Sequence, residues 1–323
     1  MSTAISRESV AAGEMSAVER FARWRRRHRQ PIEAWLMLSP ILLYYSFFFL
    51  LPVIANLIVS FTRWSGVYDK PIWVGIANYK AYLVHPYPLT LFNTALFTIS
   101  ILLIQTTVAF LIAVLLNQKV AGLGLYRALW YVPTLTSSAI TAQVFFAFIS
   151  PYDGILNAIL KAMGRPIVIW TISTLWMRTF VIVYSIWRGV GTPVVLFLAA
   201  LQGIHPEIYE AAMVDGARGR DLLRYITVPL LRPMIVFVLI TGMIAGFQIF
   251  ETVMLITAGG QSSTTSGGGP FYTTNVVLLQ IYRDAFVSNK LGMASAGSVI
   301  TAIILLWFST TNMRLMSRGR LER

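Results

Sequence analysis

Residues 91–116 read LFNTALFTISILLIQTTVAFLIAVLL, an apolar stretch without a single Asp, Glu, Lys or Arg. A helix needs about 20 apolar residues to cross the roughly 30 Å hydrocarbon core of a bilayer, so this stretch predicts a membrane-spanning helix. Uncharged runs of comparable length occur at 34–62, 128–150 and 291–313. These runs decide the fold class, because long apolar stretches of this kind need lipid as their solvent.

The composition of the whole chain agrees with this interpretation. Of its 323 residues, 56% are hydrophobic and 12% are charged, and the mean hydropathy is +0.67. An ordinary soluble domain carries about 25% charged residues, so this chain has too few polar side chains to cover a water-facing surface. Cysteine is absent, which excludes disulfides, a thiolate nucleophile and a cysteine metal site.

Two further spans carry weaker signals. The run 233–250 is slightly short, but it continues past Glu251 into more apolar residues. The apolar region 166–206 is interrupted by Arg178 and Arg188, and we expect one span within it. The prediction is therefore an all-α polytopic membrane protein with six transmembrane helices, at about 34–62, 91–116, 128–150, 175–201, 229–256 and 291–313.

The placement of the charges predicts the orientation. The net charge is +13, but the Arg residues stand between and beyond the apolar runs without an aromatic-rich basic face, so we expect no nucleic-acid partner. Of 26 Lys and Arg residues, 17 fall in the alternate segments 1–33, 117–127, 201–232 and 314–323, eight fall in the intervening loops, and Arg188 falls in a span. The positive-inside rule then predicts that both basic tails, 1–33 and 314–323, are cytoplasmic. The first apolar run is longer than the 7–15 residues of a signal peptide's apolar region, so we expect the N-terminal tail to be retained.

The loop 202–229, between the fourth and fifth predicted spans, carries the motif that points to a function. Pro206 suits the first position of a helix, where its missing N–H costs nothing. Ala211 and Ala212 are small and favour a helix, so another backbone can approach closely. Gly216 can adopt the left-handed conformation that ends a helix. This half of the loop therefore predicts a short helix that offers a docking surface.

The second half of the loop completes a recognisable pattern. Leu222, Leu223 and Ile226 have the spacing of a second short helix before Pro229 opens the next span. The whole loop resembles the EAA loop of ABC importer permeases, which reads Glu-Ala-Ala, three residues, Gly, nine residues, then Ile-x-Leu-Pro. The matching residues are Glu210, Ala211, Ala212, Gly216, Ile226 and Pro229, whereas Val228 replaces the family's Leu.

The resemblance implies that this loop docks in a groove on a separate ATPase subunit and transmits that subunit's closure to the spans. The coupling residues that it implies are Glu210, Ala211, Ala212, Asp215, Gly216, Ile226 and Pro229. None of the five Lys residues follows a Gly, so the chain lacks the Gly-Lys-Ser/Thr of a phosphate-binding loop. We therefore expect no cofactor in this chain, with ATP and Mg²⁺ on the partner.

Further matches in chain order resemble the sugar permeases of the maltose and glycerol-phosphate type, and in particular the first of the two unlike permeases that such systems pair. They are Gly75-Ile-Ala-Asn-Tyr79, Asn93-Thr94, Pro151-Tyr-Asp-Gly-Ile-Leu-Asn157, Ile186-Trp-Arg188, Tyr282-Arg-Asp-Ala-Phe286 and Leu291-Gly-Met-Ala-Ser-Ala296.

The resemblance implies a type I ABC importer transmembrane domain in a bacterial-type inner membrane. The partners that it implies are a second permease, two ABC ATPase subunits and an extracytoplasmic substrate-binding protein. The implied cargo is a sugar, whether an oligosaccharide or a related polyol or glycerol-phosphate compound, moved by alternating access. The alternative is an ion-coupled secondary transporter, which predicts buried acidic residues and inverted repeats. Either way, we expect a transport subunit rather than an enzyme.

Charged groups inside a span are costly and usually face a cavity or a partner. Arg188 lies near the middle of its span, where it either forms an ion pair or helix-carbonyl bond, or lines the pathway and contacts sugar. Glu251 lies toward the outer end of its span, where it either reaches the interface or belongs to a sugar-binding patch. That patch would combine polar groups for hydroxyls with aromatic faces for C–H surfaces, and it would consist of Phe247, Gln248, Phe250 and Glu251.

Three further features leave alternatives open or exclude a class. The stretch 189–193 reads Gly-Val-Gly-Thr-Pro and predicts a kink near Gly191, either a moving part or a static bend. The Gly/Ser/Thr-rich loop 259–270 is either a flexible outer loop or a lengthened contact with the binding protein. Metal ligation is not expected, because the three histidines lack any short metal-ligand spacing; they are His28, His85 and His205.

Overall fold

The computed structural model describes the chain from residue 33 to residue 321, with side chains as far as Thr311. The gaps in the described residues are 68, 85, 119–121, 258–268 and 270–271. The tail 1–33, except for Glu33, and most of the loop 259–270 therefore lie outside the described residues. The chain divides into two units between Asn56 and Leu57.

The first apolar run forms one helix, Glu33–Val59, of 27 residues. Its middle is π-helical over η1 (Ser46–Leu50) and its end is α2 (Leu51–Val59). The π-helical turn ends two residues before Pro52, which lacks the N–H that a regular α-helix would use. None of the 18 residues in its most apolar window is buried within the chain, as expected for a helix that has lipid around it.

The remaining elements are mostly helices. Through the fourth predicted span they are β1 (Thr62–Arg63), β2 (Ile72–Trp73), α3 (Ala77–Ala81), α4 (Tyr87–Leu116), α5 (Leu123–Leu135), α6 (Ser138–Ile149), α7 (Ile155–Ala162), η2 (Trp170–Ile172), α8 (Thr174–Gly189) and α9 (Gly191–Gln202). After it come α10 (Pro206–Val214), η3 (Leu222–Thr227), α11 (Val228–Phe247), α12 (Glu251–Thr257), α13 (Val277–Tyr282), η5 (Arg283–Val287) and α14 (Leu291–Leu321).

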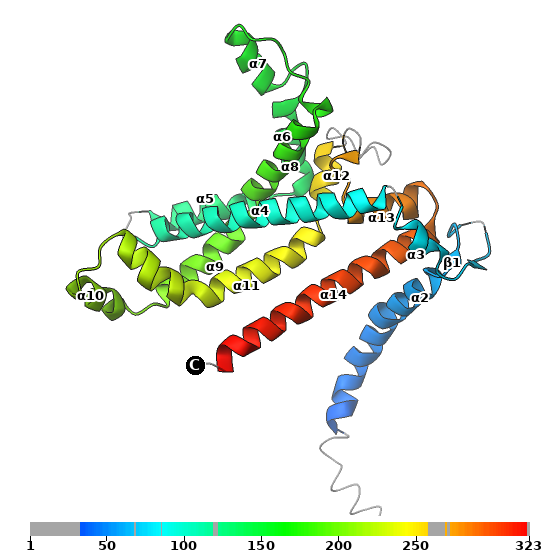
Figure 1. Cartoon of the computed structure of the whole chain (residues 1–323), viewed down its shortest axis with the longest axis horizontal. Helices are drawn as coiled ribbons and strands as arrows, with labels where there is room; N and C mark the ends of the chain where they lie inside the picture. The colour runs from blue at the N-terminus through cyan, green and yellow to red at the C-terminus, as the bar shows by residue number, and fades with distance from the viewer. Residues whose placement is uncertain are drawn as a thin grey trace, which may run out of the picture. The chain divides into compact units, whose positions relative to one another are not determined.

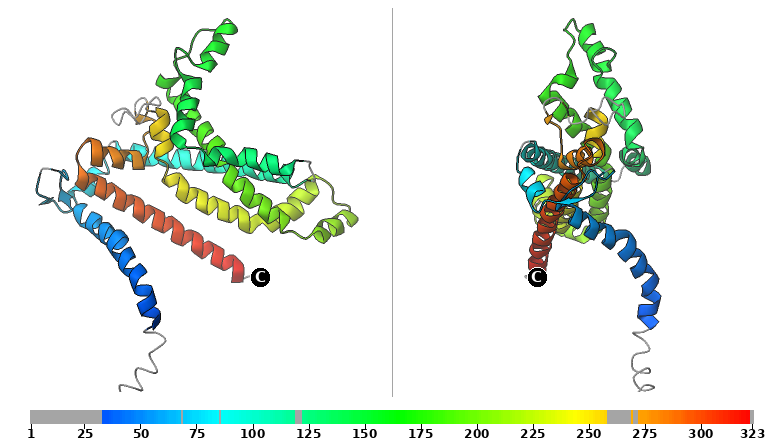
Figure 2. Two further views of the ribbon diagram at one scale, coloured as in Figure 1. Left: turned by 180° about the vertical axis from the view of Figure 1, so that it is seen from behind. Right: turned by 90° about the vertical axis from the view of Figure 1, so that its right-hand side faces the viewer.

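Helices α4, α9 and α11 pack against one another and form the main bundle (Figures 1 and 2). Their shared core includes Ala113, Phe197 and Leu231, all at most 2% exposed. Close approach between α4 and α11 depends on glycines: a Cβ on Gly246 would stand 2.5 Å from the side chain of Thr98. The short helix α10 lies at one end of this bundle, and α13 lies toward the other (Figures 1 and 2).

Two of the predicted spans are bent pairs of helices. Segment 128–150 was expected to be one span, but α5 and α6 meet at 95°, because Thr136 is extended and Ser137 is also non-helical, with ψ 127°. Helices α8 and α9 meet at 45°, which confirms the predicted kink near Gly191. As a result, α6, α7 and the start of α8 project away from the main bundle (Figures 1 and 2).

A small antiparallel hairpin, β1 with β2, follows the first helix and was not predicted. The Asn78 side chain fixes it by donating to the carbonyls of Ser60 and Thr62, each at 2.8 Å. The last helix closes the same hairpin: the Gly292 N–H donates to the Trp64 carbonyl at 3.2 Å, and a Cβ on Gly292 would collide with the Thr62 carbonyl. Residues 75–79 and 291–296, two of the stretches that resemble sugar permeases, thus lie next to each other.

Among the described residues, four helices are long and apolar enough to cross a membrane, and each bent pair passes the same test when taken together. Counting each pair as one gives up to six spans, which agrees with the predicted all-α six-span fold. The fifth predicted span, 229–256, is interrupted: α11 ends at Phe247, and α12 begins at Glu251. The sixth extends beyond 313, because α14 continues to Leu321.

Candidate functional site

Helix α10 begins and ends where the sequence predicts. Pro206 occupies the first helical turn, with Glu207 also in that turn. Gly216 follows the helix with φ +91°, the left-handed region that glycine tolerates. Nothing lies within 4 Å of a Cβ built on Gly216, so its conformation, and not crowding, sets the need for glycine there.

The second helix of this loop differs from the prediction. η3 is not a separate short helix but the start of a continuous helix, Leu222–Phe247. The Val228 N–H bonds back to Leu223, five residues earlier, and Pro229 next to it has no N–H to give. Ile226 is half-buried here, and Pro229 lies exposed in the first turn of α11.

One side-chain bond holds α10 against this helix: the hydroxyls of Tyr209 and Thr227 lie 3.2 Å apart. Four residues of the motif are exposed: Glu210, Ala211, Asp215 and Gly216. Ala212 is buried, with 9% of its surface exposed. Apolar side chains are also exposed on this loop: Val214 is 87% exposed, with Met213 and Tyr225 above 50%. A cluster of exposed apolar groups is typical of a surface that a partner covers.

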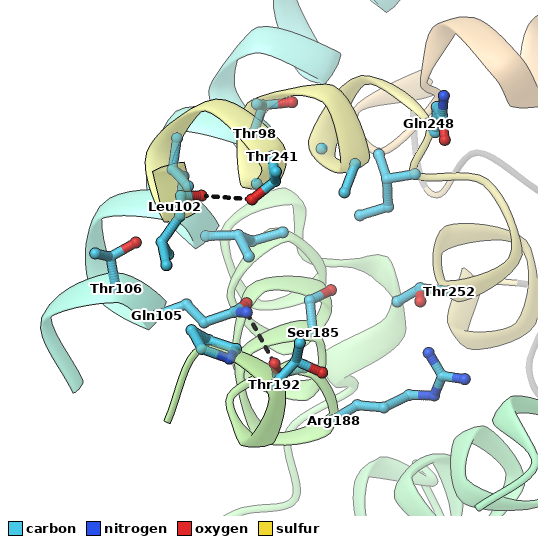
Figure 3. A pocket seen from close by; sticks show the side chains of 18 of the residues that line it. Thr98, Leu102, Gln105, Thr106, Ser185, Arg188, Thr192, Thr241, Gln248 and Thr252 are labelled. Atoms are coloured by element: carbon cyan, nitrogen blue, oxygen red, sulfur yellow. Dashed lines mark hydrogen bonds between the residues drawn. The ribbon is translucent and has the colours of Figure 1, made fainter. Parts of the chain in front are cut away.

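A cavity of about 510 Å³ opens between α4, the α8–α9 bend and the α11–α12 break (Figure 3). Its polar lining includes Thr98, Gln105, Ser185, Arg188, Thr192, Thr241, Gln248, Glu251 and Thr252. Polar groups within an apolar cavity of this size are what a small-molecule site needs to fix orientation.

Arg188 is the cationic side chain among the described residues that line this cavity. Its buried Nε has no hydrogen-bond partner, and in the described part of the chain no carboxylate lies within 4 Å of its guanidinium. Figure 3 shows the side chain extended on the side of the cavity that carries Thr252. The described residues therefore hold no ion-pair partner for the Arg188 guanidinium.

The predicted patch is brought together in part. Gln248, Phe250 and Glu251 line the cavity, but Phe247 does not. Phe247 is 7% exposed and packs its ring 5.6 Å from that of Phe308 in α14. Phe247 and Gln248 are consecutive, so their side chains leave the helix in directions about 100° apart, a difference that the sequence pattern did not resolve.

Glu251 is the first residue of α12, where a negative charge suits the positive end of the helix dipole. Its Oε1 accepts a hydrogen bond from Ser138, the first residue of α6. Tyr184 of α8 adds a bond to the same region, with its hydroxyl 2.7 Å from that of Thr141. The starts of α6 and α12 are thereby linked at the edge of the cavity.

Several contributing residues escaped the sequence analysis, although a signal for them existed. Gln105 and Thr98 line the cavity from α4, and Thr134 of α5 bonds to the Arg188 carbonyl at 2.9 Å. All three are polar residues within apolar runs, the kind of residue that usually faces a cavity or another helix.

Asn93 and Arg178 form a polar clamp near the end of the bundle that carries α13. Arg178 donates to the Asn93 Oδ1 and to the Thr273 carbonyl, each at 3.0 Å. Asn93 donates in turn to the carbonyls of Tyr272 and Asn275. The clamp fixes the segment before α13 against α4 and α8.

The clamp continues toward η5. Asn275 donates to Gln280 at 2.6 Å, and Gln280 donates to the Asp284 Oδ1 at 3.0 Å. Asp284 is 4% exposed, and its other oxygen, Oδ2, has no hydrogen-bond partner among the described residues. Burial raises the pKa of the Asp284 carboxyl above its ordinary value, although hydrogen bonds and the nearby Lys290 and Arg283 act in the opposite direction.

No protein-family model matches the chain. It is nevertheless 31% identical, over 260 residues, to the lactose transport system permease protein LacF of Rhizobium radiobacter, with 79% of this chain and 84% of LacF covered. It is 29% identical, over 289 residues, to the arabinooligosaccharides transport system permease protein AraP of Halalkalibacterium halodurans, with 88% of each covered. The trehalose/maltose transport system permease protein MalF of Thermococcus litoralis is 27% identical, with 92% of this chain and 97% of MalF covered.

Solved structures agree on the fold. A chain of a bacterial ABC transporter that imports the acidic polysaccharide alginate matches with a TM-score of 0.74 and 23% identity, covering 90% of this chain and 99% of that one. A chain of a bacterial alginate ABC transporter, solved in complex with a periplasmic protein bound to an alginate pentasaccharide, matches with a TM-score of 0.76 and 22% identity, covering 92% and 98%.

These relatives are permease subunits of transport systems, so the chain is a transport subunit rather than an enzyme, and it is itself a multi-pass membrane protein. The similarity to ABC importer permeases decides against the ion-coupled alternative. The identity to LacF and the shared fold place the chain in one family. This chain belongs to the family of sugar ABC importer permeases.

Proposed function

We propose that the cavity between α4, the α8–α9 bend and the α11–α12 break is this subunit's part of a sugar pathway. Arg188, Gln248 and Glu251 supply hydrogen-bonding groups for sugar hydroxyls, and Phe250 supplies an apolar ring for C–H surfaces. Phe247 acts from behind, by packing the end of α11 on α14. A second permease completes the pathway on the open side of the cavity.

The proposal extends to the other partners. The α10 loop docks in a groove on one of two ATPase subunits, and the cytoplasm lies on that side of the membrane, together with both termini. ATP and Mg²⁺ are held by those subunits. A substrate-binding protein delivers the sugar at the opposite, α13 end. The relatives support this arrangement, since they are permeases of transport systems for arabinooligosaccharides, lactose and trehalose or maltose.

One observation carries the proposal: a single helix joins the docking loop to the cavity. The helix Leu222–Phe247 has 26 residues, or about 39 Å at 1.5 Å per residue. Its first turns pack against α10, and its later residues, including Thr241 and Gly246, line the cavity. Movement of α10 by an ATPase therefore reaches the cavity wall through one rigid element, as alternating access requires.

The experiment is ATP hydrolysis by the complex purified through a tag on this chain, in lipid nanodiscs, with the co-expressed binding protein and a panel of sugars. We expect one class of sugar to stimulate hydrolysis, and Gly216→Pro to abolish that stimulation, because proline's φ near −65° cannot replace +91°.

Gly164→Pro is the matched control. Gly164 also has a positive φ, +72°, with open space around its Cβ, but it lies after α7 and away from the docking loop. The proposal is wrong if no ATPase co-purifies, or if both proline variants lose stimulation equally.

A further inference from the structure

The bend between α8 and α9 leaves a backbone group without its helical partner. Pro193 has no N–H, so the carbonyl of Gly189, four residues earlier, loses the hydrogen bond that a continuous helix would give it. Within a membrane an unsatisfied carbonyl is strongly destabilising unless another group replaces the partner. The sequence therefore demands a donor at this point.

Gln105 of α4 is that donor. Its Nε2 lies 3.0 Å from the Gly189 carbonyl oxygen, a bond drawn in Figure 3. A Cβ on Gly189 would stand 3.2 Å from both amide heteroatoms of Gln105, so glycine is what lets the amide approach. Thr134 supplies a second bond from α5, to the carbonyl of Arg188 at 2.9 Å. Two neighbouring helices thus hold the two carbonyls next to the bend.

We propose that Gln105 is a positioning residue of the transport cycle, which holds the α8–α9 bend against α4 and sets where Arg188 stands in the cavity. The amide acts through the Gly189 carbonyl and not on the sugar. This inference rests on the proposed function, because the cavity must be a pathway for the bend to matter in transport. The bend and α4 separate only when the Gln105 bond breaks, so the bond favours the arrangement described here.

The test removes the donor and then removes the need for it. Gln105→Met keeps the length of an unbranched side chain but cannot donate a hydrogen bond. Pro193→Ala restores a backbone N–H that can satisfy Gly189 within the helix. If Gln105 acts through this carbonyl, its substitution should matter in the native background and not in the Pro193→Ala background.

Two readouts follow the bend and the transport separately. The chain contains no cysteine, so Leu175→Cys and Val195→Cys, both exposed sites on α8 and α9, can be spin-labelled in the purified chain without competing sites before the complex is assembled. The distance between the labels is measured in the complete complex, and uptake of the stimulating sugar is measured in proteoliposomes. Gln118→Met, at an exposed glutamine just beyond α4, is the matched control.

We expect Gln105→Met to lengthen the distance between the labels and to lower uptake about tenfold, the size of effect that leaving one buried polar group unpaired produces. Gln118→Met should change neither readout. In the Pro193→Ala background, Gln105→Met should leave the distance unchanged and should change the uptake by less than about twofold. If Gln105→Met prevents assembly, Pro193→Ala should restore it.

Three outcomes would overturn the inference. One is a Gln105→Met complex with unchanged distance and uptake. Another is an equal loss in both backgrounds, with a raised KM for sugar, which would place Gln105 on the sugar itself. A third is an assembly defect that Pro193→Ala does not restore. A wild-type complex without sugar-stimulated hydrolysis would instead refute the proposed function, so the two failures are distinguishable.

Discussion

At the end of the bundle that carries α13, polar side chains bond to the backbone of neighbouring loops, whereas the α10 end leaves its groups exposed. Arg178 and Asn93 together make four bonds across α4, α8 and the segment before α13. The α10 loop has the Tyr209–Thr227 bond and a set of exposed apolar side chains. One end is fixed by the chain itself, and the other is suited to being fixed by a partner.

The largest expected effect concerns the fixed end. Arg178→Ala removes two charge-assisted bonds, to Asn93 and to the Thr273 carbonyl. We expect the free energy of unfolding to fall by about 3 kcal/mol and Tm to fall by about 6–10 °C, as measured by thermal denaturation in detergent. The control is Arg224→Ala, an exposed arginine at the α10 end. Equal losses of Tm in the two variants would show that the α13 end contributes no more to stability than the α10 end.

The next effect concerns the exposed end. Val214→Ser removes apolar surface that the chain itself does not bury, since Val214 is 87% exposed. We expect an unchanged Tm for the chain but about tenfold weaker retention of the ATPase subunit, because burial of a valine side chain contributes about 1.5 kcal/mol. The readout is the fraction of ATPase that co-purifies at rising salt and dilution. Val67→Ser, 63% exposed on the hairpin, should retain the ATPase fully.

A smaller effect is expected from the Tyr209–Thr227 bond, which links α10 to η3 at the start of the helix Leu222–Phe247. Tyr209→Phe removes a hydroxyl pair worth about 1 kcal/mol. We expect the ratio of sugar-stimulated to basal ATP hydrolysis to fall about fivefold, because α10 is less firmly attached to the helix that reaches the cavity. Tyr79→Phe removes a similar pair with Ser60, 2.6 Å apart, in the hairpin region. A drop in both variants would show that the ratio does not depend on the α10 end.

The smallest effect is a pH dependence at the fixed end. Burial raises the pKa of Asp284 in the folded chain, so its contribution to stability is fully present below the unfolded pKa and is lost as pH rises through the folded pKa. Asp284→Asn keeps an acceptor for Gln280 and carries no charge. We expect its Tm to exceed that of the wild type by about 2 °C at neutral pH, with the difference disappearing toward pH 4. A difference that grows on acidification would contradict this.

Sequence reasoning worked where the signal is local. The helices over 34–62, 91–116 and 291–313 follow from uncharged runs. The bounds of α10 follow from Pro206 and Gly216, whose backbone requirements do not depend on the rest of the fold. The kink near Gly191 was predictable for the same reason, because Pro193 removes a donor wherever it stands in a helix.

The missed features depend on residues that are distant in sequence. Asn93 was noted as part of a match, but its partner Asn275 lies 182 positions away. Gln105 was one uncharged residue in an apolar run until Gly189, 84 positions later, gave it a carbonyl. The direction in which Phe247 points depends on packing against Phe308 of α14, which no local pattern contains.

The hairpin after the first helix is one of the first structures to leave the ribosome, yet Gly292 of the last helix closes it through the Trp64 carbonyl. At a synthesis rate of about 5–20 residues per second, the 228 positions between Trp64 and Gly292 take roughly 10–50 s to appear. During that interval the Trp64 carbonyl lacks its bond from Gly292. The bond between Gly292 and Trp64 can therefore form only after the start of the last helix has been made.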